Sequence, residues 1–259
     1  MDYKITILGC GNSFGVPRPG NEWGDCDPKN QKNRRTRCSL LVQSKTTNLV
    51  VDTGQDFREQ MNAHDVKTLD AVLYTHAHGD HVAGIDDVRV YAQDKVNSGK
   101  FPVYSSQSCL TELKRRYKYL FETVNPSYPA LFRKELVKVY EPFRVGDIDI
   151  TPHLLNHGRI TALGYRFGNT AYSVDMLDLA NDDMSIDHLK GIDTWIVDAG
   201  GFMSSTNPVH ASFERIFALN EKIGAKRVIL TVLSHLIDYD SVNADLPDGF
   251  ELAYDGLIL

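Results

Sequence analysis

The chain has few cysteines, and they are not arranged as cysteines are in disulfide or zinc-binding folds. Its 259 residues include only Cys10, Cys26, Cys38 and Cys109, and no two of these form a C-x-x-C pair. In a chain of this length, scattered cysteines indicate neither a disulfide framework nor a standard zinc knuckle. Stable disulfides belong to oxidising compartments. Because the cysteine pattern indicates no disulfide framework, we expect a cytoplasmic protein.

Long apolar runs are also missing. No run approaches the roughly 18 residues from which a membrane-spanning helix is recognised. The opening segment, residues 1–8, has an acidic residue at position 2, and its apolar run breaks at Gly9. That pattern is unlike a secretory signal peptide. We therefore expect neither a leader nor a membrane partner.

Positive charge is not in excess. The chain has 28 Lys and Arg residues against 34 Asp and Glu residues, a formal net charge of -6. Broad binding to nucleic acid draws on excess positive surface, so we expect no large nucleic-acid surface. A small phosphate-bearing substrate, held by a local cationic site, is compatible with this charge.

Strand and helix patterns alternate along the chain. Short apolar stretches predict strands over residues 3–8, 38–43, 48–52, 71–74, 101–104, 162–167, 171–174, 194–197 and 227–231. Helices are predicted over residues 56–63, 86–93, 106–120 and 208–223, and a hairpin over 143–150. This alternation favours a single α/β domain over residues 1–259, with two sheets and helices outside them.

The densest group of polar residues follows the short apolar run 71–74. Three histidines and one aspartate fall within six residues, in the pattern H-x-H-x-D-H: His76, His78, Asp80 and His81. Neutral imidazole and carboxylate are good ligands for zinc, manganese and iron. A solvated histidine-rich loop is the alternative, but chance rarely places three histidines and an aspartate directly after a buried strand. The pattern therefore predicts a metal site.

The spacing within this motif suggests two metals. His76 and His78 are two residues apart just past a strand end, where extended backbone puts both rings on one side. Asp80 and His81 follow at a turn that begins a helix, so they can point to a second position. Two metals roughly 3.5–4 Å apart suit hydrolysis, because one activates water and the other steadies the charged oxygens of the substrate.

Four local ligands cannot close two sites, so later strand ends must contribute. The candidates are His157, in Leu155-Asn156-His157-Gly158, and Asp175, in Tyr172-Ser173-Val174-Asp175. An aspartate after an apolar strand often only caps a helix, and both readings of Asp175 stay open at this point. Asp198 also ends a predicted strand, and it could orient an imidazole ligand or simply form the turn before Gly200.

Together these residues resemble the metallo-β-lactamase-fold hydrolases, whose most specific signature is H-x-H-x-D-H. Val51-Asp52-Thr53-Gly54 is similar to the strand-end V-D-x-G motif that braces their site. Within the superfamily, the chain is similar to the cyclic phosphodiesterases associated with carbon–phosphorus lyase and, more distantly, to tRNase Z. The resemblance runs from Ile5 to Leu259 and implies a four-layer αββα sandwich. It is also carried by the segments 9–17, 84–89, 163–166 and 253–256.

The resemblance implies a ligand set for two divalent metal ions, zinc or manganese, with iron also suitable. One ion would be held by His76, His78 and His157. The second would be held by Asp80 and His81, and Asp175 would bridge both.

The resemblance also implies the catalytic residues. His210, in Asn207-Pro208-Val209-His210-Ala211-Ser212, matches the family's non-ligand histidine, which is assigned as the general acid for the leaving oxygen. Histidine titrates near neutral pH, which suits that role. A surface histidine at a helix N-terminus is the alternative interpretation. We predict His210 and Asp80 as catalytic residues.

The sequence departs from the family pattern in two places. Many relatives have a last metal-binding histidine after the final core strand, and here that register holds Val232, which cannot bind metal. His235, three residues later, matches a histidine that is usually not a ligand. The second metal site is therefore expected to be weak or empty. The N-terminal loop, where some relatives cluster cysteines around a structural zinc, holds only Cys26, so we predict no structural zinc.

The predicted function is a metal-dependent phosphodiesterase that acts on small or cyclic phosphodiesters through a metal-activated hydroxide. One alternative is a hydrolase of another bond on the same scaffold, such as a thioester or a lactone. Another is a metal-binding or ligand-binding protein with degenerate catalysis, which Val232 suggests. A small phosphodiester is the expected partner, and a homodimer stays open.

Overall fold

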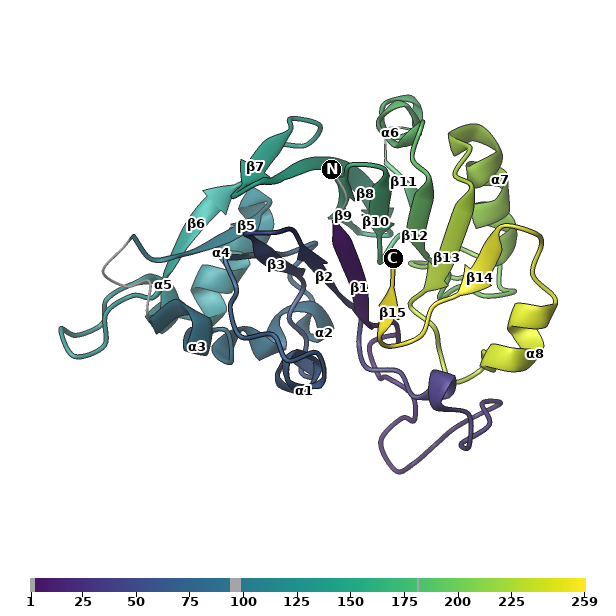
Figure 1. Ribbon diagram of the computed structural model, residues 1–259, viewed down its shortest axis with the longest axis horizontal. Coiled ribbons are helices and arrows are strands. Elements are labelled where there is room, and N and C mark those ends of the chain that lie inside the picture. The colour runs from purple at the N-terminus through teal and green to yellow at the C-terminus, as the bar shows by residue number, and fades with distance from the viewer. Residues whose placement is uncertain (1–2, 94–98, 181) are drawn as a thin grey trace.

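Two sheets pack face to face between two groups of helices (Figure 1). The computed structural model describes residues 3–93, 99–180 and 182–259. Helices α1–α5 lie on the outer side of one sheet, and α6 and α7 lie on the outer side of the other. The predicted single-domain αββα sandwich is confirmed. Among the described residues, each helix is too short or too polar to cross a membrane.

The first sheet contains seven strands, mixed in direction. Its order is β15 (Leu257–Ile258), β1 (Lys4–Gly9), β2 (Ser39–Gln43), β3 (Asn48–Val51), β4 (Ala71–Leu73), β5 (Phe101–Ser105) and β6 (Phe132–Leu136).

The second sheet is also mixed, and β7 (Phe143–Val145) pairs with its long strand β8. Its order is β11 (Asp178–Leu179), β8 (Ile148–His157), β9 (Ile160–Phe167), β10 (Thr170–Ser173), β12 (Thr194–Asp198), β13 (Arg227–Thr231) and β14 (Phe250–Leu252).

Short helices connect the strands. They are α1 (Phe57–Ala63), α2 (Gly79–Val82), α3 (Arg89–Ala92), α4 (Gln107–Arg116), α5 (Lys118–Phe121), α6 (Asp182–Leu189), α7 (Phe213–Ile223) and α8 (Tyr239–Ala244), with 3₁₀ turns at Gln31–Asn33 and Ala83–Asp86.

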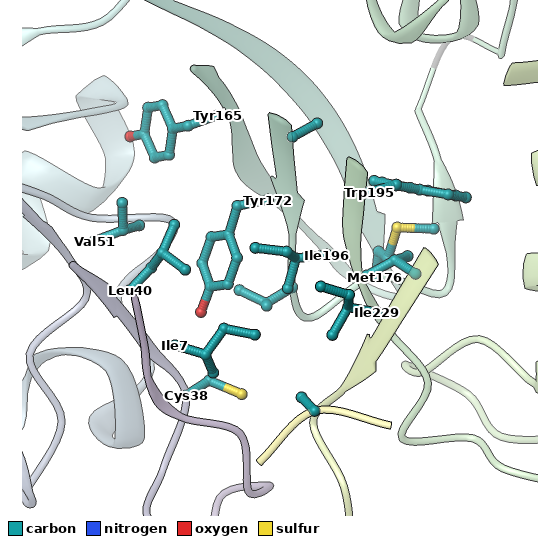
Figure 2. Packing of buried hydrophobic residues seen from close by; sticks show 14 of the residues in the cluster. Ile7, Cys38, Leu40, Val51, Tyr165, Tyr172, Met176, Trp195, Ile196 and Ile229 are labelled. Atoms are coloured by element: carbon teal, nitrogen blue, oxygen red, sulfur yellow. The ribbon is translucent and has the colours of Figure 1, made fainter. Parts of the chain in front are cut away.

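The side-chain alternation of the first sheet explains why both of its faces are buried. In β2, Leu40 and Val42 face the core between the sheets, whereas Leu41 faces the core under α1–α5. In β3, Val51 faces inward and Val50 outward in the same way. Such two-sided burial is expected when successive side chains point to opposite faces. Figure 2 shows the inner core, in which Leu40 and Val51 lie with Tyr172, Ile196 and Ile229 of the second sheet.

Parallel strands bring polar residues to one edge of the sandwich. In the first sheet β3 runs parallel to β4, and in the second sheet β10, β12 and β13 are parallel. Three residues just past these strands have left-handed backbone: Asp52 (φ 62°), Asp175 (φ 54°) and Val232 (φ 63°). Residues outside the favoured backbone regions gather at functional sites. This edge of the sandwich is therefore a candidate functional site.

The predicted helices differ from the observed ones in three places. The helix predicted over residues 106–120 is interrupted at Tyr117, whose φ of -118° and ψ of 44° separate α4 from α5. Of the helix predicted over 86–93, only the four residues of α3 are α-helical, and the 3₁₀ turn before them ends at Asp86. The helix predicted over 208–223 begins only at Phe213, because Ser212 is its N-cap.

Candidate metal centre

The histidine motif spans the end of β4 and the start of α2. His76 and His78 lie in the extended segment after β4, and Asp80 and His81 lie in the first turn of α2. His157 is the last residue of β8, in the opposite sheet. The structure brings four potential ligand atoms within 4.8 Å of one another, one each from His76, His78, His157 and Asp175.

A second group shares Asp175 with the first. Potential ligand atoms of Asp80, His81 and Asp175 also lie within 4.8 Å of one another. Oδ2 of Asp175 is 3.3 Å from Nε2 of His81, 3.6 Å from Nε2 of His76 and 3.5 Å from Nε2 of His157. The structure thus gathers all six predicted ligands into two groups around one carboxylate, although their role as ligands stays a prediction.

The state of the imidazoles fits a divalent metal. Burial, helped by the neighbouring imidazole of His81, lowers the pKa of His76 well below its usual value. Burial also lowers the pKa of His78. Both rings are therefore neutral near pH 7, which is the form that binds metal. Nε2 of His76 is buried with no hydrogen-bond partner among the described residues, and such an atom is costly unless something binds it.

Hydrogen bonds at the other ring nitrogen direct Nε2 toward the centre. Nδ1 of His157 donates to the backbone carbonyl of Val209 over 3.0 Å. Nδ1 of His76 lies 3.0 Å from the hydroxyl of Thr75. Metal-binding histidines use their second nitrogen in this way, which fixes the ring orientation.

Asp52 holds His81 and Thr75 in place by hydrogen bonds, as the V-D-x-G resemblance implies. Its side chain is fully buried, and Oδ2 accepts hydrogen bonds from Nδ1 of His81 over 2.7 Å and from the hydroxyl of Thr75 over 2.8 Å. Oδ1 accepts from the backbone N–H of Thr75 over 2.8 Å. A Cβ on Gly54 would lie 2.2 Å from the carbonyl oxygen of Asp80, so only glycine allows this close approach.

Carboxylates dominate the electrostatics around His81. Burial disfavours the charged imidazole, yet Asp175 and Asp52 together raise the pKa of His81 well above its usual value. The same carboxylates would attract a divalent cation. This half of the centre therefore favours positive charge, whether a proton or a metal supplies it.

His210 forms a close pair with Asp198, beside the shared carboxylate. Nδ1 of His210 is 2.7 Å from Oδ2 of Asp198, which is fully buried at the end of β12. Backbone N–H groups of Met176 and Gly200 also donate to Asp198, each over 2.7 Å. Burial opposes the imidazolium, but the charge and hydrogen bond of Asp198 raise the pKa of His210 to about 9. The ring is thus protonated near neutral pH.

The Asp198–His210 pair was not predicted. The strand pattern marked Asp198 as a strand end, and the resemblance marked His210, but nothing in the sequence joined the two. Asp198 forms the turn at Gly200, and the imidazole that it contacts is that of His210, which is not one of the predicted metal ligands. His210 itself lies before the N-cap of α7 and is 19% exposed, so it is not a surface histidine on a helix.

Val232 and His235 both follow strand β13 in the chain. Val232 follows β13 and is 2% exposed. Nε2 of His235 lies 3.2 Å from Nη1 of Arg18 and 3.7 Å from Oε1 of Glu22, in the N-terminal segment. The ligand groups found among the described residues do not include His235. The geometry therefore offers the second group no replacement ligand from His235.

Comparison with known proteins agrees with this geometry. A β-lactamase superfamily domain matches residues 47–231. The crystal structure of a diphosphatase from the PhnP family is 32% identical, with a TM-score of 0.88 over 100% of this chain and 97% of that chain. Human tRNase Z, short form, has a TM-score of 0.71 at 16% identity, over 99% of this chain and 98% of that chain, and it supports the fold alone.

The name of one curated relative describes acyl transfer instead of the hydrolysis of a phosphate compound. An octanoyltransferase of Porphyromonas gingivalis is 33% identical over 258 residues, or 98% of this chain. The match covers 51% of that protein, so the chain spans about half the length of this relative. The domain match and the PhnP-family structure confirm the resemblance that the sequence motifs carry. The chain therefore belongs to the β-lactamase superfamily and has the metallo-β-lactamase fold.

Proposed function

We propose that the protein is a metal-dependent phosphodiesterase that acts on small or cyclic phosphodiesters. The observation that carries this proposal is the pair of ligand groups sharing Asp175, beside the hydrogen-bonded Asp198–His210 pair. The likeness to a PhnP-family diphosphatase over the whole chain supports a phosphorus substrate. We further propose that the metals are two divalent ions, zinc or manganese, with iron also suitable.

The two ligand groups indicate which residues would hold each ion. His76, His78, His157 and Asp175 would hold one ion, and Asp80, His81 and Asp175 the other. Divalent ions, when bound, lower the pKa of water and neutralise phosphoryl oxygens.

The protein's own residues supply the proton. Nδ1 of His210 is engaged by Asp198, so only Nε2 is free to donate to the leaving oxygen. Asp198 fixes the ring orientation and favours the charged form. A protonated imidazole at this place is therefore a general acid for the departing alcohol.

The direct test is hydrolysis of two diesters by metal-free protein to which zinc or manganese has been returned. We expect turnover of bis(p-nitrophenyl) phosphate and of 2′,3′-cyclic nucleotides, and its loss when a chelator is added. The metal-free protein is the control. Metal-loaded protein that hydrolyses neither diester would contradict the proposal.

A second candidate is thioester hydrolysis on the same scaffold. The match to a relative named octanoyltransferase favours it, because that name implies an acyl substrate. Octanoyl-N-acetylcysteamine assayed beside the diesters distinguishes the two. Faster turnover of the thioester than of either diester would favour this candidate.

We expect a Val232→His protein to bind the second metal more tightly. A β-branched valine at φ 63° is an outlier, whereas histidine tolerates left-handed backbone better and adds an imidazole. Titration with manganese should show a second-site Kd lowered by about tenfold or more, since one added ligand typically contributes at least as much as an outer-shell contact.

The matched control for this change is Val232→Asn, which relieves the same backbone conformation without adding an imidazole. Equal manganese affinity in the two variants would show that position 232 does not face the second metal.

A further inference from the structure

A cavity of about 400 Å³ lies beside His210. Its size is within the range of small-molecule sites, roughly 300–1,000 Å³. The lining residues that matter here are Asp178, Ser204, Ser205, His210, Glu214 and Arg215. Because a general acid must reach the leaving oxygen, the group bonded to that oxygen lies in the space that His210 lines.

Backbone hydrogen bonds hold the two walls of this cavity together. The N–H of Gly201 donates to the carbonyl of Ala211 over 3.0 Å, and the N–H of Phe213 donates to the carbonyl of Phe202 over 2.9 Å. Ser212 caps α7 by accepting from the N–H of Arg215. The loop that carries Ser204 and Ser205 is thus tied at its base to the start of α7.

The guanidinium of Arg215, which lines the cavity, is paired with the carboxylate of Asp178. Nη2 of Arg215 lies 2.7 Å and 2.5 Å from the two carboxylate oxygens of Asp178, and the side chains are 35% and 29% exposed. Glu214 adds a further carboxylate to the lining. Besides His210, an anionic leaving group would therefore meet two carboxylates and, among the described lining residues, one guanidinium that is already paired.

The uncharged part of the lining is hydroxyl-rich. Three serines, Ser204, Ser205 and Ser212, contribute to it beside the apolar Leu177, Ala211 and Ala218, and among the described lining residues the one ring is the imidazole of His210. Such a surface offers donors and acceptors to hydroxyl groups, and its one described ring belongs to His210, which is proposed to act on the leaving oxygen. Asp178 and Arg215, half-exposed, add one acceptor and one donor of the same kind.

We propose that this cavity is the leaving-group subsite, and that the Arg215–Asp178 pair makes it select an uncharged, hydroxyl-bearing leaving group over an anionic one. This inference rests on the proposed phosphodiesterase function. Asp178 acts here as a specificity-determining residue, because its carboxylate cancels the charge that would otherwise bind an anion.

The test compares an Asp178→Asn protein with the wild type on symmetric diesters, in which the leaving group is unambiguous. Bis(2,3-dihydroxypropyl) phosphate presents hydroxyls, and bis(2-sulfoethyl) phosphate presents an anion that binds metals poorly. Dividing each variant's kcat/KM by that of the wild type cancels the intrinsic reactivity of each diester.

In Asp178→Asn, the preference for the sulfoethyl diester over the dihydroxypropyl diester should rise by about tenfold. That is the effect of one charge-assisted hydrogen bond made available by the freed guanidinium. Arg215→Gln should shift the same ratio the opposite way, so the pair of variants still tests the proposal if one of them folds poorly. The matched control is Asp149→Asn, which breaks a similar pair with Arg144 on an exposed hairpin and should leave the ratio unchanged.

The two possible failures are distinguishable. If the metal-loaded wild type hydrolyses no diester, bis(p-nitrophenyl) phosphate included, the proposed function fails. If it hydrolyses them but neither variant moves the ratio, the cavity does not select the leaving group and the inference is overturned.

Discussion

An Asp175→Asn protein should lose metal from both ligand groups and lose at least about a thousandfold of its metal-dependent turnover. Asp175 is the carboxylate that the groups share, and its Oδ2 lies within 3.6 Å of three imidazole Nε2 atoms. Bound metals contribute several kcal/mol of charge stabilisation, and each 1.36 kcal/mol is tenfold in rate.

The amide is the informative replacement at this position. Asn has nearly the shape of Asp and tolerates the left-handed backbone at φ 54°, so the fold should persist. It removes the negative charge that, together with Asp52, raises the pKa of the buried His81. Metal per chain after dialysis against zinc or manganese is the primary measurement, with thermal unfolding as the check on folding.

A second carboxylate provides the control for this experiment. Asp255 accepts hydrogen bonds from Thr36 and from the N–H of Cys10 and belongs to none of the ligand groups found among the described residues. Asp255→Asn should keep its metal even if its stability falls. An Asp175→Asn protein that still holds two metals per chain would show that this carboxylate bridges nothing.

The half of the site that is local in sequence could be predicted from sequence alone. His76, His78, Asp80 and His81 lie within six residues, so strand-end and helix-start geometry constrains them directly. His157 and Asp175 lie in the other sheet, and their meeting with the motif depends on how two sheets pack. Their places at strand ends made them candidates, the resemblance implied that they are ligands, and the structure brings them together with the motif.

The missed features depend on contacts that leave no local pattern. Asp198 and His210 are joined by one hydrogen bond across a loop. The start of α7 depends on Ser212 capping Arg215 N–H, and the expected glutamate of a capping box is absent at position 215. The two-residue strands β11 and β15 are too short for any alternation to be recognised.

Removing the acid should separate substrates by their leaving groups. A His210→Ala protein is expected to lose about 10²–10⁴-fold in turnover of dialkyl or 2′,3′-cyclic diesters, the usual contribution of general acid–base catalysis. Its turnover of bis(p-nitrophenyl) phosphate should fall by less than about tenfold, because nitrophenolate departs without a proton. His188→Ala is the control: His188 lies in the last turn of α6, where its ring packs against Tyr140, and the change should affect neither rate.

Metal content decides what a loss of activity in this variant means. Atoms of Asp175, Asp198 and His210 also lie within 4.8 Å of one another, so this trio could itself hold an ion. If His210 is the acid, the alanine variant keeps the metal content of the wild type, because Nδ1 is engaged by Asp198 rather than by metal. Lost metal would make His210 a ligand instead. Equal losses on alkyl and nitrophenyl diesters, with metal retained, would mean that His210 positions the substrate and does not donate the proton.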